Sequence, residues 1–213
     1  LAVALYTQID RIMLGKMVSE EAVGFYAAAS TIAVMWEFVP TAIVNSANPL
    51  LLGEYGRDRK KFEEKYQILL LGITLLGVIV SIGFTIFGKL VVFILYGKEY
   101  FASVSALSVL IWSTAFAMIG TARSIWVIAE GKNKYVKYYT SIGAVMNALL
   151  NAIIIPRWGI TGAACTTLFT QMFIAVAAPL LFKETKEFFR IYMGGFKRVP
   201  EAMVLLKSTL KNK

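Results

Sequence analysis

Long stretches without charged residues recur along this chain, and they restrict the folds open to it. With one charge at most in each, the stretches are 22–53, 66–88, 100–129, 138–156 and 158–182. Each reaches about 20 residues, the length that an α-helix needs to cross the hydrocarbon core of a membrane. None alternates between apolar and polar residues as a barrel strand does. The sequence therefore predicts an all-α membrane protein, a polytopic helical bundle.

The composition excludes several other classes of protein. Apolar residues make up 58% of the chain and charged residues only 16%, whereas soluble domains carry about a quarter of charged residues. The net charge of +9 does not by itself indicate nucleic-acid binding, because membrane proteins also gather basic residues in their cytoplasmic loops. There is one cysteine and no histidine, so we expect no disulfide framework, no metal site and no cofactor.

We predict five complete transmembrane helices and one truncated helix at the N-terminus. The first apolar run is too short to cross the membrane and begins at Leu1 without a basic flank, so we expect the start of this helix to lie upstream. A bundle of residues 1–182 results, with spans at about 1–14, 23–50, 67–88, 103–129, 138–156 and 161–182.

Basic residues alternate between the connecting segments and predict the orientation. Segment 54–66 has five Lys and Arg residues, segment 130–137 has three and the tail from Lys183 has eight, while the loops between them have few. Cytoplasmic loops carry this excess. We therefore expect a multi-pass protein of the cytoplasmic (inner) membrane, with its C-terminus in the cytoplasm.

The C-terminal segment 183–213 is of a different kind. Basic residues are interleaved with aromatic and aliphatic ones, a pattern typical of a helix that lies on an anionic membrane surface. We predict one or two interfacial helices, broken at Gly194, Gly195 and Pro200. The segment acts as an anchor or, alternatively, as a docking arm.

Ionisable residues inside the predicted spans are costly and mark functional candidates. Glu37 lies near the middle of its span, and we predict that it couples transport to an ion in a wet cavity or pairs with Arg123. Arg123 either snorkels to the inner interface beside Trp126 or meets a phosphate in the lumen. Asp10 is the other candidate for ion coupling, although a hydrated pair with Arg11 at the outer boundary would also explain it.

Amide side chains are the remaining candidates for a substrate path. Asn45 and Asn48 lie in the inner half of the second span, and Asn147 and Asn151 are four residues apart on one face of the fifth. A helix face with two amides prefers another helix or a wet cavity to lipid. Either environment would bring these side chains into the interior.

Proline and glycine residues suggest hinges and close helix contacts. Pro40 removes a backbone hydrogen bond and can kink its helix, while small residues let helices approach closely. We take Pro40, Gly24, Gly159 and Gly162 as packing or hinge positions.

No motif for chemistry accompanies these features. The sequence has no phosphate-binding loop, no zinc-protease or serine-hydrolase motif and no paired carboxylates at a site. Membrane glycosyltransferases and polymerases need substrate-holding loops or acidic catalytic clusters outside the bilayer. We therefore expect the protein not to be an enzyme.

Several short segments, in this order and spacing, resemble a known family. They are YTQIDRIMLG (6–15), VGFYAAAS (23–30), FGKLVVFILYGKEY (87–100), WVIAEGKNK (126–134) and NALLNAIIIPRWGITGAACTT (147–167). They resemble the C-terminal half of polysaccharide transporters, the flippases of lipid-linked O-antigen and capsule repeat units in the multidrug/oligosaccharidyl-lipid/polysaccharide exporter superfamily. The resemblance implies two pseudo-symmetric bundles with the substrate path between them, and this chain would be the C-terminal lobe.

The resemblance implies a flippase that moves polyprenyl-diphosphate-linked oligosaccharides across the cytoplasmic membrane by alternating access. Its partners would be that substrate, membrane lipids, a coupling ion (H⁺ or Na⁺) and polysaccharide polymerases, without nucleic acid. Two alternatives stay open. One is an ion-coupled drug antiporter of the same superfamily, and the other is a membrane scaffold of a polysaccharide assembly complex that does not transport.

Overall fold

The structure is a computed structural model that describes residues 2–197, and this part of the chain is helical without any strand. The α-helices are α1 (Ala2–Met17), α2 (Glu20–Met35), α3 (Phe38–Tyr55), α4 (Arg59–Tyr96), α5 (Ser103–Ala129), α6 (Asn133–Met172), α7 (Ala178–Leu181) and α8 (Lys186–Lys197). Three short turns complete the set: the 3₁₀-helices η1 (Lys98–Tyr100) and η3 (Lys183–Thr185) and the π-helix η2 (Phe173–Ala177). The predicted all-α fold is confirmed.

Helix starts and ends follow from local chemistry. The Ser19 hydroxyl accepts a hydrogen bond from the backbone N–H of Ala22 at 3.1 Å and caps α2. Asp58 caps α4 in the same way, through the N–H groups of Lys60 and Lys61. The helix α4 is followed by its C-cap Gly97, which has a φ of 83°. Glycine adopts this value at little cost, because it has no Cβ atom.

Four continuous helical stretches of the described chain are long and apolar enough to cross a membrane. They are Glu20–Tyr55, Arg59–Tyr96, Ser103–Ala129 and Asn133–Leu181. Their outward faces carry large apolar side chains such as Ile79, which is 67% exposed, and Leu149, which is 63% exposed. Such a surface suits lipid, and the chain is accordingly a multi-pass membrane bundle.

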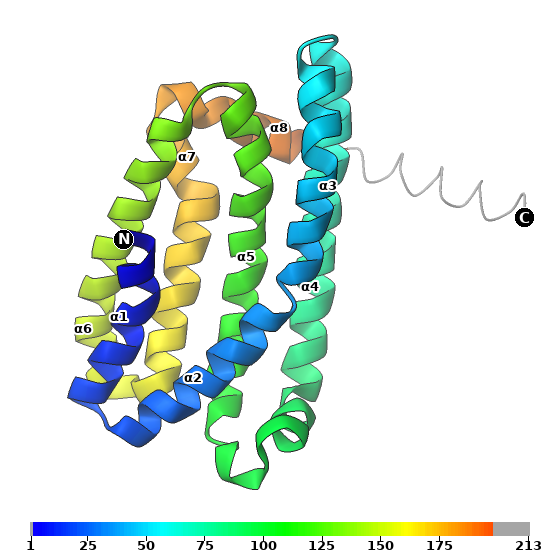
Figure 1. The fold of residues 1–213 in the computed structure, drawn as a ribbon. Helices are drawn as coiled ribbons and strands as arrows, with labels where there is room; N and C mark the ends of the chain where they lie inside the picture. The colour runs from blue at the N-terminus through cyan, green and yellow to red at the C-terminus, as the bar shows by residue number, and fades with distance from the viewer. Residues whose placement is uncertain (1, 198–213) are drawn as a thin grey trace, which may run out of the picture.

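The fourth stretch reverses direction in its middle. Within α6, Gly159 has φ 53° and ψ −133°, which are not helical values, and Figure 1 shows the ribbon turning back there so that two arms of α6 lie side by side. The predicted spans 138–156 and 161–182 fall on these first and second arms. Pro156, three residues before the reversal, lies inside the first arm.

The first stretch is also broken, between α2 and α3. In Figure 1, α2 slants across the bundle and α3 runs upright beside α4. Pro40 has no N–H to donate to the carbonyl of Trp36, and that carbonyl accepts instead from Val39 at 3.1 Å. The bend at Trp36 and Glu37 is therefore the local consequence of Pro40.

Two buried apolar clusters hold the helices together. One joins α3, α4, α5 and α8 and includes Tyr66, Trp126 and Phe188. The other joins α1, α2, α4, α5 and α6 and includes Leu14 and Leu107. The pocket described below lies beside the second cluster, where α1, α2, α5 and α6 meet.

An ion-pair network ties together the α8 end of the bundle, where the α3–α4 turn, the α5–α6 turn and α8 meet (Figure 1). Arg59 forms ion pairs with Glu130 at 2.5 Å and Glu187 at 3.1 Å. Tyr55 donates to Glu130 at 3.0 Å, and Lys132 lies 3.2 Å from the same carboxylate. Burial alone raises the pKa of Glu130, but these hydrogen bonds outweigh it and hold that pKa below its ordinary value.

The helix α8 packs more deeply than an interfacial anchor. Its side chains Phe188, Ile191 and Tyr192 are buried in the first apolar cluster. The predicted break at Gly194 and Gly195 was wrong, because α8 continues through both glycines. A Cβ atom at Gly195 would lie 3.1 Å from the carbonyl oxygen of Gln67, so the glycines allow α8 to approach α4 closely. The predicted break at Pro200 lies outside the described residues.

Candidate functional site

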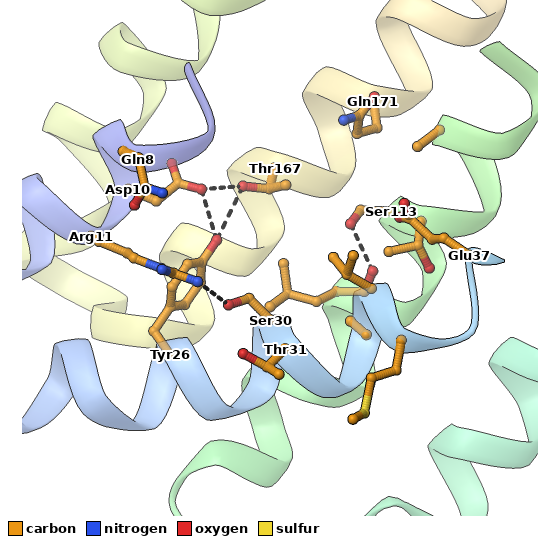
Figure 2. A pocket seen from close by; sticks show the side chains of 16 residues that line it. Gln8, Asp10, Arg11, Tyr26, Ser30, Thr31, Glu37, Ser113, Thr167 and Gln171 are labelled. Atoms are coloured by element: carbon orange, nitrogen blue, oxygen red, sulfur yellow. Dashed lines mark hydrogen bonds between the residues drawn. The ribbon is translucent and has the colours of Figure 1, made fainter. Parts of the chain in front are cut away.

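A partly open pocket of about 620 Å³ lies between α1, α2, α5 and the second arm of α6 (Figure 2). Its polar lining comes from all four elements, and apolar side chains fill the rest. The polar lining residues are Gln8, Asp10, Arg11, Tyr26, Ser30, Thr31, Glu37, Ser113, Thr114, Thr167 and Gln171. Concave sites with a few converging polar groups are typical of ligand binding.

Arg11 brings a positive charge to one end of this pocket. Its Nη2 donates a hydrogen bond to the Ser30 hydroxyl at 2.9 Å, and Ser30 in turn donates to the carbonyl of Ala27 at 3.0 Å. No carboxylate lies within ion-pair distance of Arg11 in the part of the chain that the structure describes. A guanidinium with donors to spare is suited to bind phosphate or carboxylate groups.

Asp10 is held by hydrogen bonds and does not pair with its neighbour Arg11. The side chain is 5% exposed. Its Oδ2 accepts from the hydroxyls of Tyr26 and Thr167, each at 2.7 Å, and its Oδ1 accepts from the amide of Asn151 at 2.5 Å. The alternative of a hydrated Asp10–Arg11 pair is therefore not what the structure contains. The two side chains have different partners: Asp10 accepts from Tyr26 and Thr167, whereas Arg11 donates to Ser30 (Figure 2).

The amides of Asn147 and Asn151 extend the network around Asp10 into the α6 hairpin. Both side chains are fully buried. The Asn151 amide also donates to Oδ1 of Asn147 at 3.0 Å, and its own Oδ1 accepts from the Thr166 hydroxyl. Thr166 lies on the second arm, so the network joins both arms of the hairpin to α1 and α2.

Glu37 lies at the bend between α2 and α3, at the other end of the pocket from Arg11 (Figure 2). The bend is fixed to α5, because the indole N–H of Trp36 donates to the Thr114 hydroxyl at 2.8 Å. The half-buried Glu37 carboxylate has no hydrogen bond or ion pair among residues 2–197. In particular, it does not pair with Arg123.

Arg123 lies away from the pocket, against the π-helix η2. It is 3% exposed, and its Nη1 donates to the carbonyls of Ile174 and Ala175 at 2.8 and 3.3 Å. Its guanidinium stacks over the rings of Tyr139 and Phe188, 5.0 and 5.7 Å from their centroids. A π-helical turn disturbs the regular pattern of helix hydrogen bonds, and Arg123 supplies donors to two of its carbonyls. A phosphate has no access to it in this conformation.

The second pair of predicted amides also lies outside the pocket. Asn45 is exposed and Asn48 is half-buried, both on α3, while the pocket lining stops at Glu37 on this side. The structure thus brings Asp10, Asn147 and Asn151 together, places Glu37 at the pocket, and leaves Asn45, Asn48 and Arg123 apart from it.

The small residues fall into different roles. A Cβ atom at Gly162 would lie 3.0 Å from side-chain atoms of Ile154 and Trp158, so this glycine permits close packing of the two arms of α6. Gly159 makes the reversal itself. A Cβ atom at Gly24 would meet nothing within 4 Å, so no close contact depends on that residue.

Sequence reasoning missed Arg11, Tyr26 and Thr167 as pocket residues. Arg11 follows Asp10 directly, and successive residues of an α-helix point about 100° apart. Two adjacent helix residues are therefore poorly placed to pair with each other. That geometry was available from the sequence. The partners of Tyr26 and Thr167 were not, because they come from helices distant in the chain.

Comparisons with known proteins agree with this architecture. A family model described as "Polysaccharide biosynthesis protein" matches residues 1–105. The probable flippase AglR of Haloferax volcanii is 28% identical over 180 residues, which cover 81% of this chain and 37% of AglR. A putative O-antigen transporter of Shigella dysenteriae is 25% identical over 176 residues, 82% of this chain and 44% of that protein.

The chain is thus similar to a polysaccharide biosynthesis family and to proteins described as a flippase and an O-antigen transporter. The family resemblance drawn from the sequence is thereby confirmed. The chain spans less than half of the length of either relative, and no solved structure matches it significantly. The match to the polysaccharide biosynthesis model covers Asp10, Arg11, Tyr26 and Glu37 but ends before the α6 hairpin.

Proposed function

We propose that this chain is the C-terminal lobe of a flippase that moves polyprenyl-diphosphate-linked oligosaccharide repeat units across the cytoplasmic membrane by alternating access. The observation that carries the proposal is the pocket inside an apolar helical bundle, with the unpaired guanidinium of Arg11 at one end. Similarity to a polysaccharide biosynthesis family, a probable flippase and a putative O-antigen transporter supports a role in polysaccharide export. Translocation makes and breaks no covalent bond, so the protein would not be an enzyme.

Arg11 is the candidate for the diphosphate in this proposal, in place of Arg123. A diphosphate needs donors that remain available, and in the part of the chain that the structure describes the Arg11 guanidinium donates one hydrogen bond, to Ser30. Ser30, Thr31 and Gln171 offer hydroxyl and amide groups for sugar hydroxyls. The lipid tail would stay outside, along the apolar face of the bundle.

The α8 end of the bundle faces the cytoplasm in this proposal. The basic segments 54–66 and 130–137 meet α8 and its residues Lys186 and Arg190 at this end, and basic residues are typical of cytoplasmic loops. Asp10 is the first candidate for ion coupling, because a carboxylate buried among movable hydroxyls and amides can respond to H⁺ or Na⁺.

The first test measures surface glycan in a deletion strain of the protein's own host, with the complete gene supplied from a plasmid. Wild-type protein should restore surface glycan and remove the lipid-linked repeat units that accumulate without it. Arg11→Gln should lower surface glycan at least about tenfold, because a charge-assisted hydrogen bond contributes about 1.5–3 kcal/mol.

The matched control is Arg157→Gln. Arg157 is exposed and donates only to the carbonyl of Ile153, so this variant should export normally. Normal export by a correctly inserted Arg11→Gln protein would contradict the role of Arg11, and a deletion strain with undiminished surface glycan would contradict the flippase proposal.

A drug antiporter is the second candidate function, favoured by the unpaired Glu37 beside the apolar side chains of Val34, Met35 and Leu110 in the pocket. A cationic amphipathic drug would suit such a lining. Ion-driven efflux of a cationic dye from vesicles, without any effect on glycan export, would favour this candidate over the flippase.

A further inference from the structure

The pocket holds two charged groups of opposite sign that do not neutralise each other. Arg11, on α1, donates a hydrogen bond to Ser30 of α2, and Glu37 lies seven residues after Ser30, at the bend that follows α2. At 1.5 Å per residue, Ser30 and Glu37 are about 10 Å apart along the helix axis. Figure 2 shows Arg11 and Glu37 on opposite sides of the pocket, separated by the side chains that line it.

Each of these charges lacks a charged partner in the described chain. Arg11 has only neutral Ser30, and the Glu37 carboxylate has no hydrogen bond or ion pair among residues 2–197. Charges withdrawn from water are costly unless they are paired. The remaining acidic group of the lining, Asp10, is occupied by Tyr26, Thr167 and Asn151, so it does not compete for a cationic ligand.

A ligand that satisfies both ends must itself carry separated charges. The guanidinium of Arg11 fits a phosphate, and the carboxylate of Glu37 fits an ammonium group. The lining between them includes the hydroxyls of Ser30 and Thr31 and the amide of Gln171, which can hydrogen-bond a hydroxylated ring. A sugar phosphate without an ammonium group would leave the Glu37 carboxylate desolvated and unpaired. The pocket would therefore bind such a ligand less tightly.

We infer that the pocket recognises the phosphate ester of an amino sugar with a free amine, its phosphate at Arg11 and its ammonium group at Glu37. The inference rests on the proposed function, because the amino sugar would be part of the lipid-linked repeat unit that the flippase moves. It goes further in assigning Glu37 to substrate selection rather than to ion coupling.

The test is calorimetric binding to the purified complete protein in nanodiscs, with three soluble probes. Glucosamine 1-phosphate carries both charges, N-acetylglucosamine 1-phosphate lacks the amine charge, and glucosamine lacks the phosphate. The wild-type protein should bind glucosamine 1-phosphate about tenfold more tightly than each of the other two, since each lacks one charge-assisted contact.

Two variants separate the ends of the pocket. Glu37→Gln should bind both sugar phosphates with the weaker wild-type affinity, so that the preference for the amine disappears. Arg11→Gln should weaken both sugar phosphates about tenfold and leave glucosamine unchanged. Asn45→Ala, on the exposed face of α3 outside the pocket, is the control and should bind all three probes as wild type does.

The inference is overturned if wild-type protein binds the two sugar phosphates equally, or if Glu37→Gln keeps the preference. It is also overturned if Glu37→Gln loses affinity for both sugar phosphates, because Glu37 would then serve the protein's own structure or coupling. These readouts do not involve translocation. Selective binding without restored surface glycan would overturn the flippase proposal alone, and restored surface glycan without amine preference would overturn this inference alone.

Discussion

At the scale of single residues, Asp10 shows how a buried carboxylate can be stable without a counter-charge. Three donors from α2 and α6 surround its two oxygens. Two of these donors, the hydroxyls of Tyr26 and Thr167, can turn to accept as well as donate, whereas the Asn151 amide nitrogen can only donate. Substitutions at Asp10 therefore differ in what they leave unpaired.

We expect Asp10→Ala to lower the free energy of unfolding by about 1–3 kcal/mol for each buried donor left unsatisfied. Asp10→Asn should be much milder, because its oxygen can accept from Asn151 while its amide faces the two hydroxyls. Thermal unfolding in nanodiscs measures the difference, with exposed Glu20→Ala as control. Equal losses from both Asp10 variants would show that the hydrogen-bond account is wrong.

The sequence predicted individual members of the site but not how they combine. Asp10, Glu37, Asn147 and Asn151 stood out because polar groups are costly in lipid. Arg123 stood out for the same reason, yet it donates to the carbonyls of residues 174 and 175 in the π-helix. The sequence around Arg123 does not indicate that these carbonyls need donors. Contacts between helices distant in the sequence decide which buried polar residue lines a cavity and which one holds the bundle together.

At the scale of helices, the hairpin in α6 depends on one backbone conformation. Gly159 adopts φ 53° and ψ −133°, a combination that costs residues with a Cβ about 1–3 kcal/mol. Gly24, by contrast, lies within α2 with open space around it. Both residues were predicted as packing or hinge positions, and their sequence surroundings do not distinguish them.

We expect Gly159→Ala to lower the free energy of unfolding by about 1–3 kcal/mol. Gly24→Ala, the matched control, should be neutral or stabilising by up to about 1 kcal/mol, because alanine is the better helix former. Denaturation of both purified variants in the same lipid tests this pair. A neutral Gly159→Ala would mean that the reversal does not need a glycine.

At the scale of the whole molecule, the α8 end is held by charges as well as by apolar packing. Glu130 receives hydrogen bonds from Tyr55, Arg59 and Lys132, which join the α3–α4 turn to the α5–α6 turn. The basic residues there were predicted from the sequence as cytoplasmic loops and an anchor. Their pairing with Glu130 and Glu187 was not, because it depends on how α8 packs against α4.

Since the pKa of Glu130 in the folded protein lies below its ordinary value, its ionised form stabilises the fold. This contribution is complete above the pKa of the unfolded chain and is lost as the pH falls through the lower, folded pKa. We expect acidification from pH 7 toward pH 3 to destabilise wild type more than Glu130→Gln, by up to about 1 kcal/mol, because the pairs are partly exposed.

Unfolding of both proteins as a function of pH measures this difference. Glu21→Gln, at an exposed position in the first turn of α2, is the control and should keep the pH dependence of wild type. If Glu130→Gln also keeps it, other carboxylates govern the acid response.

The bend before Pro40 has a mechanical consequence for the pocket. Pro40 removes one helix hydrogen bond at this point, while Thr41 still donates to the carbonyl of Glu37 at 3.0 Å, so the bend lacks part of the bonding that stiffens a regular helix. Arg11 is bonded to the straight part of α2, whereas Glu37 belongs to the bend itself. Any rotation at this bend changes the distance between the two charges. The angle between α2 and α3 would therefore depend on the length of the molecule bound between them.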